Sequence, residues 1–422
     1  MLEFDFIGRL NSPPLLPNNG RNETGKRDCR TGSEMMDFDL SHEQRQILEY
    51  GDAIAQKYDR KYWMDCAEKH VFPEALYQQI ADDGFVGTMV PEAYGGAGQG
   101  MIEMHLFLEG LSNNGIPLLN LVVGAAMSLG FIAKYGSPAQ KNRYLPDACK
   151  GKTRFCFAIT ESDAGSNTIR TTTIAKRRGN RFALSGQKTF ITDADGSDFA
   201  LVVARTTPHA EVKRKTEGFT LFVVDLKAKG VAKQYIPVSI PAPETQWQLF
   251  FDEVDLGPEH VVGEIDGGFG ILFKSLNPER ILVGSICCGL GRYALSRAVA
   301  YAKERKVFND VPIGAYQGLQ HPLASARTDV EMASLMTLKA AWIFDQGREA
   351  GEFANMAKLA AADAGIKAVD TAIQCHGGNG FTKEYGIFDL YPMVRLLKTA
   401  PLNREMILNY IGEHVMGLPR SY

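Results

Sequence analysis

The sequence has little that would tie it to disulfide chemistry, a polyanion or a membrane. Its seven cysteines are scattered, odd in number and never spaced as C-x-x-C, which predicts buried thiols in a reducing cytoplasm and neither a disulfide framework nor a metal site. Lysine and arginine total 46 against 49 aspartates and glutamates, so we expect no electrostatic attraction to nucleic acid or an anionic bilayer. The uncharged stretch 110–133 is interrupted by Asn113, Asn114, Pro117 and Asn120, which argues against a membrane span.

Three common nucleotide-binding and catalytic motifs are also missing. No G-x-G-x-x-G follows an expected strand, and neither a G-x-x-x-x-G-K-[ST] loop nor a G-x-S-x-G elbow occurs. Nicotinamide binding on a doubly wound sheet, P-loop chemistry and serine hydrolysis therefore lack their usual support. What the composition does indicate is a folded globular chain, because 45% of the residues are apolar and 23% are charged.

The hydrophobic pattern divides the chain into a tail and three segments. Residues 1–36 combine prolines, asparagines and charges of both signs without the apolar core of a signal peptide, and we expect a tail outside the fold. Residues 37–153 have helical periodicity, and Ser41 followed by Gln44 predicts a capping box at the first helix. Residues 154–270 contain short β-rich runs, and residues 271–422 return to helical patterns at about 276–305, 324–348, 355–374 and 404–414. This order predicts an α+β fold.

The β-rich segment contains one clear hairpin signal. Residues 174–178 and 182–185 flank Gly179 and Asn180, residue types typical of a tight turn. Further β-rich runs lie at 155–160, 188–192, 199–204, 219–224 and 248–251. Together these runs predict a compact antiparallel sheet.

Two glycine-bearing turns carry chemical information. Residues 157–166, FAITESDAGS, leave a strand and enter a turn whose backbone N–H groups can face an anion such as a pyrophosphate. Residues 374–381, QCHGGNGF, stand at an expected helix C-terminus, where paired glycines allow left-handed backbone and close approach of a ligand. Each turn taken alone is also compatible with an ordinary structural role.

Taken in order, these turns and two shorter motifs resemble the acyl-CoA dehydrogenase family of flavoproteins. The shared patterns are Thr-Glu-x-x-x-Gly-Ser from Thr160 to Ser166, KTFIT at 188–192, Arg305-x-x-Phe308, and Gln-x-x-Gly-Gly-x-Gly-Phe-x-x-Glu-Tyr from Gln374 to Tyr385. The resemblance covers the chain from about residue 37 to its end. It implies an N-terminal helical domain (37–153), a middle antiparallel β domain (154–270) and a C-terminal four-helix bundle (271–422), with FAD as cofactor.

The resemblance also implies which residues contact FAD. Thr160 would lie near the flavin N1, O2 or N5 atoms, and the backbone at Gly165 and Ser166 would face the pyrophosphate. Arg305, Phe308 and Gln317 would reach the cofactor of a neighbouring subunit, and Gln374 and Gly378 its adenosine diphosphate half. The segment 309–314 is one residue longer than the family pattern. The full set of implied FAD contacts is Phe157, Ile159, Thr160, Gly165, Ser166, Phe190, Thr192, Arg305, Phe308, Gln317, Gln374 and Gly378.

The reaction that the resemblance implies removes the α-proton of an acyl thioester and needs a base. A desolvated glutamate suits this role because burial raises its pKa toward the working range. Most family members carry the glutamate after the Glu-Tyr motif, where this sequence has Pro401, which cannot act as a base. Isovaleryl-CoA and long-chain dehydrogenases carry it in a Leu-x-x-Glu-Arg context, which LNPER at 276–280 matches. The resemblance therefore implies Glu279 as the base, and Arg280 and Ser166 as substrate contacts.

The sequence thus predicts an FAD-dependent acyl-CoA dehydrogenase, a cytoplasmic homotetramer or dimer that passes electrons to an electron-transfer flavoprotein. Two alternatives stay open. The same fold can serve a flavin oxidase or monooxygenase that uses O₂, and the missing usual glutamate can mark a noncatalytic flavin-binding partner subunit. The second alternative depends on whether Glu279 is a buried base or a helix-surface charge, and Pro278 before it can kink the helix.

Overall fold

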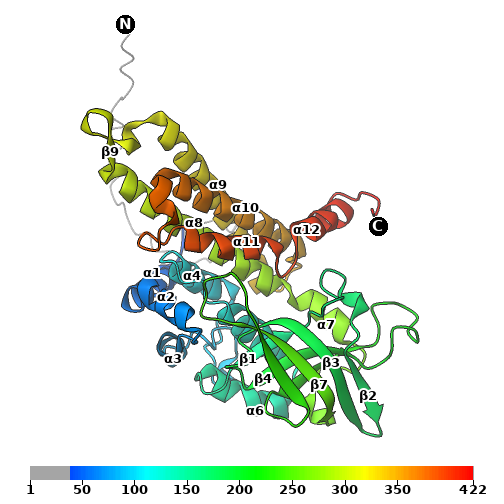
Figure 1. Ribbon diagram of the computed structural model, residues 1–422. Helices are drawn as coiled ribbons and strands as arrows, with labels where there is room; N and C mark the ends of the chain where they lie inside the picture. The colour runs from blue at the N-terminus through cyan, green and yellow to red at the C-terminus, as the bar shows by residue number, and fades with distance from the viewer. Residues whose placement is uncertain (1–38, 422) are drawn as a thin grey trace, which may run out of the picture. The chain divides into compact units, whose positions relative to one another are not determined.

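The computed structural model describes residues 39–421, so the predicted tail at 1–36 lies outside the described residues. The first helix begins as expected, because Ser41 Oγ accepts a hydrogen bond from the Gln44 N–H at 3.2 Å and the Gln44 side chain accepts one from the Ser41 N–H at 3.1 Å. The N-terminal helices are α1 (His42–Lys57), α2 (Arg60–Lys69), α3 (Glu74–Asp82), α4 (Met101–Ser112), a π-helical segment (Leu121–Leu129), α5 (Gly130–Tyr135) and α6 (Pro138–Cys149) (Figure 1). Between residues 39 and 421, no helix is both long and apolar enough to cross a bilayer.

The middle segment folds into one eight-stranded sheet. Its strands are β1 (Phe155–Ala158), β2 (Ile174–Arg178), β3 (Arg181–Thr192), β4 (Phe199–Arg205), β5 (Phe219–Asp225), β6 (Val231–Ile236), β7 (Gln246–Leu256) and β8 (Val261–Val262). They follow the order β6-β7-β3-β2-β4-β5-β8, and β1 pairs with β4. The predicted hairpin is confirmed, since Arg178 faces Arg181 across Gly179, whose φ is +63°. The sheet is nevertheless mixed, because β1 and β2 each run parallel to β4.

The C-terminal segment is built from long helices that pack along one another. They are α7 (Gly268–Ser275), α8 (Asn277–Glu304), α9 (Gln317–Asp345), α10 (Gly351–His376), α11 (Tyr391–Thr399) and α12 (Arg404–Tyr410). Helices α8, α9 and α10 pack on one another pairwise, and α11 packs on α8 and α10 (Figure 1). A small hairpin of β9 (Lys306–Val307) and β10 (Val311–Pro312) links α8 to α9.

Helices α8 and α10 approach closely because small residues face each other. A Cβ on Gly365 would lie 3.0 Å from the Cys287 carbonyl oxygen, and one on Gly291 would lie 3.4 Å from the Ala368 Cβ. Cys287 and its small neighbours thus serve helix packing. The described cysteines are all free and buried.

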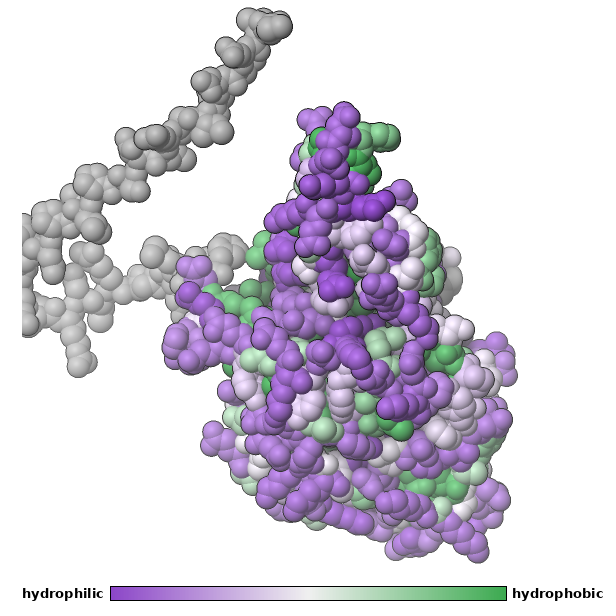
Figure 2. Space-filling model, turned by 60° about the vertical axis from the view of Figure 1, so that its left-hand side comes forward, coloured by the Kyte–Doolittle hydropathy of each residue, from purple (hydrophilic) through white to green (hydrophobic). Residues whose placement is uncertain are grey.

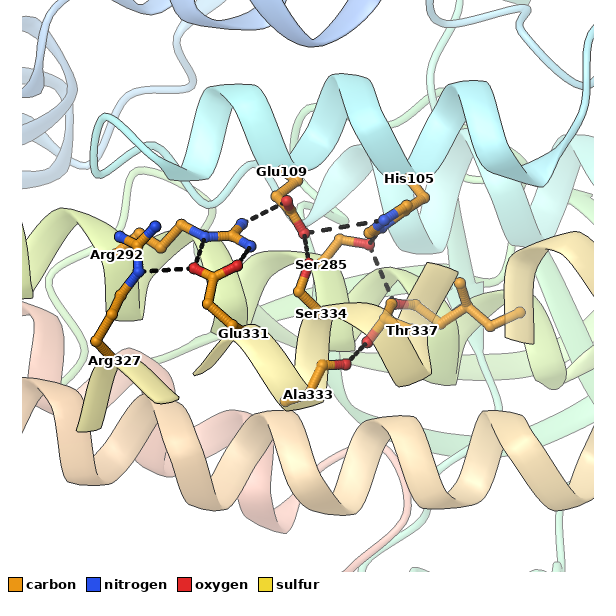
Figure 3. A network of polar contacts seen from close by, with 10 residues as sticks. His105, Glu109, Ser285, Arg292, Arg327, Glu331, Ala333, Ser334 and Thr337 are labelled. Atoms are coloured by element: carbon orange, nitrogen blue, oxygen red, sulfur yellow. Dashed lines mark hydrogen bonds and ion pairs between the residues drawn. The ribbon is translucent and has the colours of Figure 1, made fainter. Parts of the chain in front are cut away.

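A partly buried polar network joins α4 to α8 and α9 (Figure 3). The Glu109 carboxylate on α4 accepts hydrogen bonds from Arg292 Nη1 on α8 at 2.5 Å and from Ser334 Oγ on α9 at 3.2 Å. Arg292 also donates two hydrogen bonds of 2.9 Å to the Glu331 carboxylate. The single hydrogen bonds of Glu109 thus hold α4 against α8 and α9, while the bidentate Arg292–Glu331 pair joins α8 to α9.

Several large apolar side chains remain exposed on the C-terminal helices and their hairpin. Phe308 is 82% exposed, and Met332, Leu335 and Trp342 on α9 are all more than two-fifths exposed. These three α9 residues share one helix face, because their spacing of three and seven residues matches the helical repeat. The face of the molecule in Figure 2 is mainly hydrophilic, with apolar residues in small scattered groups.

Candidate active site

The turn after β1 is held against β3 by a buried lysine. Lys188 is fully buried, and its Nζ donates to the Ile159 carbonyl oxygen and to Glu161 Oε1, both at 2.8 Å. The Thr160 carbonyl oxygen accepts a hydrogen bond from the Thr189 N–H at 2.9 Å. The two motifs that the sequence singled out, at 157–166 and 188–192, therefore form one structural unit.

The Glu161 carboxyl is ionised within this unit. Burial alone would raise its pKa, but the Lys188 ammonium and hydrogen bonds from Thr173 and Thr172 outweigh burial and hold the pKa well below its ordinary value. Both oxygens have partners, because Oε2 accepts from the Thr172 N–H and hydroxyl at 2.7 Å each, and Oε1 from the Thr173 N–H at 3.0 Å. Loss of Lys188 would leave a buried, unpaired negative charge.

Open space lies beside this unit. Phe190 is 60% exposed and has a φ of +55°, at an irregularity in the pairing of β3 with β7. Gly165 and Ser166 are exposed, and a Cβ on Gly165 would meet no other atom within 4 Å. An exposed aromatic ring and accessible backbone on one structural unit suit a planar cofactor that carries a pyrophosphate.

Other predicted residues of the middle domain are more enclosed. Phe157 is only 8% exposed and stacks on Phe131 with ring centroids 5.9 Å apart. Ile159 is half-buried, and the Thr192 hydroxyl accepts a hydrogen bond from Gln246 Nε2 at 3.1 Å. Phe157 thus lies in the core behind the exposed turn.

A second cluster of predicted residues meets at the carboxyl ends of α8 and α10. A groove of about 380 Å³ is lined by Tyr301, Arg305, Ile313, Leu319, Gln374, Cys375, His376, Gly377, Gly378 and Asn379. A Cβ on Gly378 would meet no other atom within 4 Å, so this loop also leaves its backbone accessible. Gln317 begins α9, and its neighbours Gly318 and Leu319 share a smaller pocket with Gln374.

The histidine in this loop, His376, is a packing residue. His376 is buried, and its Nδ1 lies 2.7 Å from the Ala372 carbonyl oxygen. Its ring stacks on Tyr301 with centroids 4.5 Å apart and meets Tyr385 edge-on. The stacked rings brace the glycine loop from behind.

The predicted base, Glu279, lies in the first turn of α8. The preceding helix ends before Leu276, and Pro278 falls at the start of α8, where its missing N–H removes no helical hydrogen bond. Pro278 therefore lies in the first turn of α8 and does not kink it. Glu279 is 8% exposed, so it is not a helix-surface charge.

The surroundings of Glu279 suit a proton acceptor. Burial raises the pKa of its carboxyl to about 8, while the charges of Arg280 and Lys358 oppose that rise. Arg280 is itself buried and donates to Asn277 Oδ1 at 3.0 Å, and its Nε has no hydrogen-bond partner among the described residues. A carboxyl with a pKa close to neutrality, beside a buried guanidinium with a spare donor, can exchange a proton with a polar ligand.

Lys358 is hydrogen-bonded to the segment that contains Pro401, the other position considered for the base. Lys358 on α10 is within electrostatic range of Glu279, and its Nζ donates to the carbonyl oxygens of Lys398 at 3.1 Å and Leu402 at 2.6 Å, on either side of Pro401. Next along the chain, Asn403 Nδ2 donates to Ser166 Oγ at 2.7 Å. The start of α8, the 398–403 segment and the middle-domain turn therefore converge.

Lys188, Lys358 and Asn403 contact predicted site residues or their flanking backbone, although sequence patterns alone assign them no role. In the sequence, Lys358 is noticeable as a cation among the alanines of an expected helix, one residue after Ala357 and three before Ala361. Lys188 is the first residue of the KTFIT motif, in which the resemblance assigns FAD contacts to Phe190 and Thr192. Asn403 caps α12 by accepting a hydrogen bond from the Met406 N–H at 2.9 Å, which is a local signal for a helix start.

Comparison with known protein families accounts for nearly the whole described chain. It matches the acyl-CoA dehydrogenase N-terminal domain over residues 41–152, the middle domain over 156–254 and the C-terminal domain over 266–416. The acyl-CoA dehydrogenase FadE12 of Mycobacterium tuberculosis is 44% identical over 386 residues, which is 91% of this chain and 98% of the relative. The caffeyl-CoA reductase-Etf complex subunit CarC of Acetobacterium woodii is 31% identical over 327 residues, 77% of this chain and 85% of CarC.

Solved structures agree with these matches. Butyryl-CoA dehydrogenase from Megasphaera elsdenii superimposes with a TM-score of 0.85 at 25% identity, covering 90% of this chain and 100% of that one. PigA, solved with FAD and proline, shares the fold with a TM-score of 0.86 at 23% identity, covering 91% of this chain and 100% of PigA. The chain belongs to the acyl-CoA dehydrogenase family and is a flavoprotein oxidoreductase whose cofactor is FAD.

Proposed function

We propose that the protein converts an acyl-CoA thioester to the 2-enoyl-CoA, with Glu279 as the base that removes the α-proton. The observation that carries the proposal is the burial of Glu279 beside Arg280, at the point where the start of α8, the 398–403 segment and the turn with Ser166 converge. A noncatalytic subunit would gain nothing from an acidic side chain in this position, because burial of an unneeded carboxylate is unfavourable.

In this proposal the Glu279 carboxylate takes the α-proton as the C–H bond at the β-carbon breaks. FAD held by the residues named below would supply the hydride acceptor for the β-carbon, so that two electrons would leave the substrate and the α,β double bond would form. Arg280 and Ser166 face the thioester, since both lie at the same convergence and each carries a hydrogen-bonding group. Pro401, which has no N–H and no acidic group, forms part of the wall of the proposed thioester site.

The residues that we propose to hold FAD fall into the two clusters already described. Around the flavin ring and the pyrophosphate these are Phe157, Ile159, Thr160, Gly165, Ser166, Phe190 and Thr192; at the far end of the C-terminal helices they are Arg305, Phe308, Gln317, Gln374 and Gly378. Phe190 and Gly165 support the first cluster by their exposure, and the groove at Gln374 and Gly378 supports the second.

The distance between these clusters supports assembly from more than one copy of the chain. The turn containing Ser166 meets the segment near the start of α8, whereas Arg305 caps the other end. Helix α8 has 28 residues and is therefore about 42 Å long. We infer a homodimer or homotetramer in which the second cluster of one subunit completes the cofactor site of its neighbour, with the exposed Phe308 at the junction.

We further propose an electron-transfer flavoprotein as the electron acceptor. A relative of this chain, CarC, is named as a subunit of a complex with Etf. Mixing the reduced enzyme with air-saturated buffer in a stopped-flow instrument distinguishes this acceptor from the alternative, reoxidation of the flavin by O₂. An oxidase regains the absorbance of oxidised flavin within turnover time, whereas a dehydrogenase needs the flavoprotein acceptor.

The central test is anaerobic bleaching of the flavin by butyryl-, isovaleryl-, octanoyl-, palmitoyl- and 3-phenylpropionyl-CoA. Glu279→Gln keeps the size of the side chain and removes the proton acceptor, and we expect bleaching to slow by about 10²–10⁴-fold with unchanged FAD content. Glu405→Gln is the matched control, because Glu405 is an exposed acidic residue in the first turn of α12.

The pH dependence adds a second criterion. Because the Glu279 carboxyl must be ionised to accept a proton, the wild-type bleaching rate should rise with pH through a midpoint near the pKa of about 8. Bleaching of Glu279→Gln at the wild-type rate would place the base elsewhere, and no bleaching of the wild type by any of the five thioesters would favour the noncatalytic alternative.

A further inference from the structure

The Asn403 side chain makes two hydrogen bonds whose directions are fixed. Asn403 precedes α12 with extended backbone, and its Oδ1 accepts a hydrogen bond from the Met406 N–H at 2.9 Å. Its Nδ2 donates to Ser166 Oγ, which lies 2.7 Å away in the middle-domain turn. A backbone N–H can only donate, so the amide oxygen of Asn403 must face Met406 and its NH₂ group must face Ser166.

This orientation determines what the Ser166 hydroxyl can do. A serine hydroxyl carries one hydrogen to donate and accepts on its oxygen. Because Asn403 uses the oxygen as an acceptor, the hydroxyl hydrogen points elsewhere, and no other residue between 39 and 421 accepts it. Ser166 is exposed and follows Gly165, where a Cβ would meet no other atom within 4 Å. The hydroxyl hydrogen is therefore available to a ligand on the open side of the turn.

A hydroxyl that can only donate selects its partner by chemistry. Next to accessible backbone N–H groups, it favours an oxygen of a phosphate group or of a carbonyl, and it does not favour a donor such as an amine or an amide N–H. FAD and an acyl-CoA thioester both carry such acceptor oxygens. The two possible sources can be distinguished by measuring the affinity for each ligand separately.

We propose that Asn403 is a positioning residue that commits the Ser166 hydroxyl to donate its hydrogen to an oxygen of the bound ligand. This proposal rests on the function proposed above, in which Ser166 contacts FAD or the thioester. The two residues belong to different domains and are 237 positions apart. The cap at the start of α12 thus orients a donor on the middle-domain turn.

The decisive variant is Asn403→Asp, because aspartate caps a helix as well as asparagine does and is nearly the same size. The new carboxylate can only accept, so it takes the Ser166 hydrogen and reverses the bond. Asn403→Ser also keeps the cap, but its one oxygen is engaged by the Met406 N–H, so the bond to Ser166 is lost without being reversed. Asn409→Asp is the matched control, because it adds the same charge to the same helix.

Two affinities are measured, in a buffer with about 0.5 M NaCl, where the Debye length is about 4 Å and long-range charge effects are screened. The affinity for FAD comes from the release of flavin on dilution of the holoenzyme, followed by flavin fluorescence. The affinity for the substrate comes from the concentration that half-saturates anaerobic bleaching, with the thioester of the panel that bleaches the wild type fastest. Each variant is made both alone and together with Ser166→Ala.

The expected results follow from the direction of the bond. Ser166→Ala should weaken the binding of FAD, of the thioester or of both about tenfold, since one hydrogen bond to the ligand is lost. Asn403→Asp should weaken the same ligand to a similar extent, whereas Asn403→Ser should cost about threefold, because the hydroxyl can still turn toward the ligand. In the Ser166→Ala background Asn403→Asp should add less than about twofold, because its effect passes through Ser166. Asn409→Asp should change neither affinity.

Three results overturn the proposal. These are wild-type affinities for both ligands in Asn403→Asp, wild-type affinities in Ser166→Ala, and an effect of Asn403→Asp that is the same with and without Ser166. If Asn403→Asp does not fold, Asn403→Ser with and without Ser166→Ala decides by the same criterion. If no thioester bleaches the wild type, the proposed dehydrogenation fails, while flavin release needs no turnover and still judges the role of Asn403.

Discussion

Replacing Lys188 by methionine should destabilise the protein strongly, because the buried Glu161 carboxylate would lose its cationic partner. Lys188 is fully buried, and the Glu161 carboxylate that it binds is 4% exposed. Removal of one partner from a buried ion pair leaves an uncompensated charge and costs about 3–5 kcal/mol. The Thr172 and Thr173 donors remain on Glu161 and place the expected loss near the lower end of that range, at about 3 kcal/mol.

The loss should depend on pH, with a defined sign. In the wild type the folded-state pKa of Glu161 is lowered, so its contribution to stability is present above the unfolded-state value of about 4.3 and is lost as pH falls through the folded value. Without Lys188, burial dominates and the pKa of Glu161 rises. The variant is then penalised above about pH 5 and relieved when the carboxyl binds a proton, so the difference from wild type shrinks in acid.

Urea unfolding of the apoprotein, followed by far-ultraviolet circular dichroism at pH 7 and pH 4.5, measures this difference. Arg181→Met is the matched control, because Arg181 lies on the same strand and pairs with Asp255 through two 2.8 Å hydrogen bonds at the surface. An exposed pair contributes about 0–1 kcal/mol. The double variant Lys188→Met/Glu161→Gln should recover part of the stability, since no buried charge is left unpaired.

The same variant also probes the cofactor site. The pair fixes the turn 159–166 against β3, so Lys188→Met should weaken FAD binding in a fluorescence titration, whereas Arg181→Met should not. The reasoning is refuted if Lys188→Met loses less than about 1 kcal/mol at pH 7. It is equally refuted if the loss is the same at both pH values.

Two further predictions concern the helices. Glu109→Gln should lower the free energy of unfolding by about 1–3 kcal/mol, because Arg292 and Ser334 lose a charged acceptor while Arg292 keeps Glu331. The urea midpoint measures this loss. A loss within experimental error would show that Glu331 alone is a sufficient partner for Arg292. Phe308→Asp should reduce both the molar mass by light scattering and the FAD content, because an 82% exposed aromatic ring at the second cluster is expected to meet a neighbouring subunit. A wild-type monomer with full FAD content would contradict the shared site.

Features that depend on neighbouring residues follow from the amino-acid order alone. The capping box at Ser41, the turn at Gly179 and the three segments of different period are local signals, because a helix or a tight hairpin is specified by residues a few positions apart. The family is equally readable from the chain, since its motifs are short and contiguous. The predicted α+β order and FAD cofactor are confirmed for this reason.

Pairings between distant residues are decided only when the chain folds. The sequence predicts an antiparallel sheet, yet β1 and β2 run parallel to β4, because strand direction depends on a partner that lies far along the chain. Lys188 on β3 meets Glu161 in the turn after β1, and Lys358 on α10 meets the backbone of residues 398 and 402. The burial of Glu279 has the same origin. Whether a carboxyl is hydrated or enclosed depends on every element packed around it, and that environment is what sets its pKa.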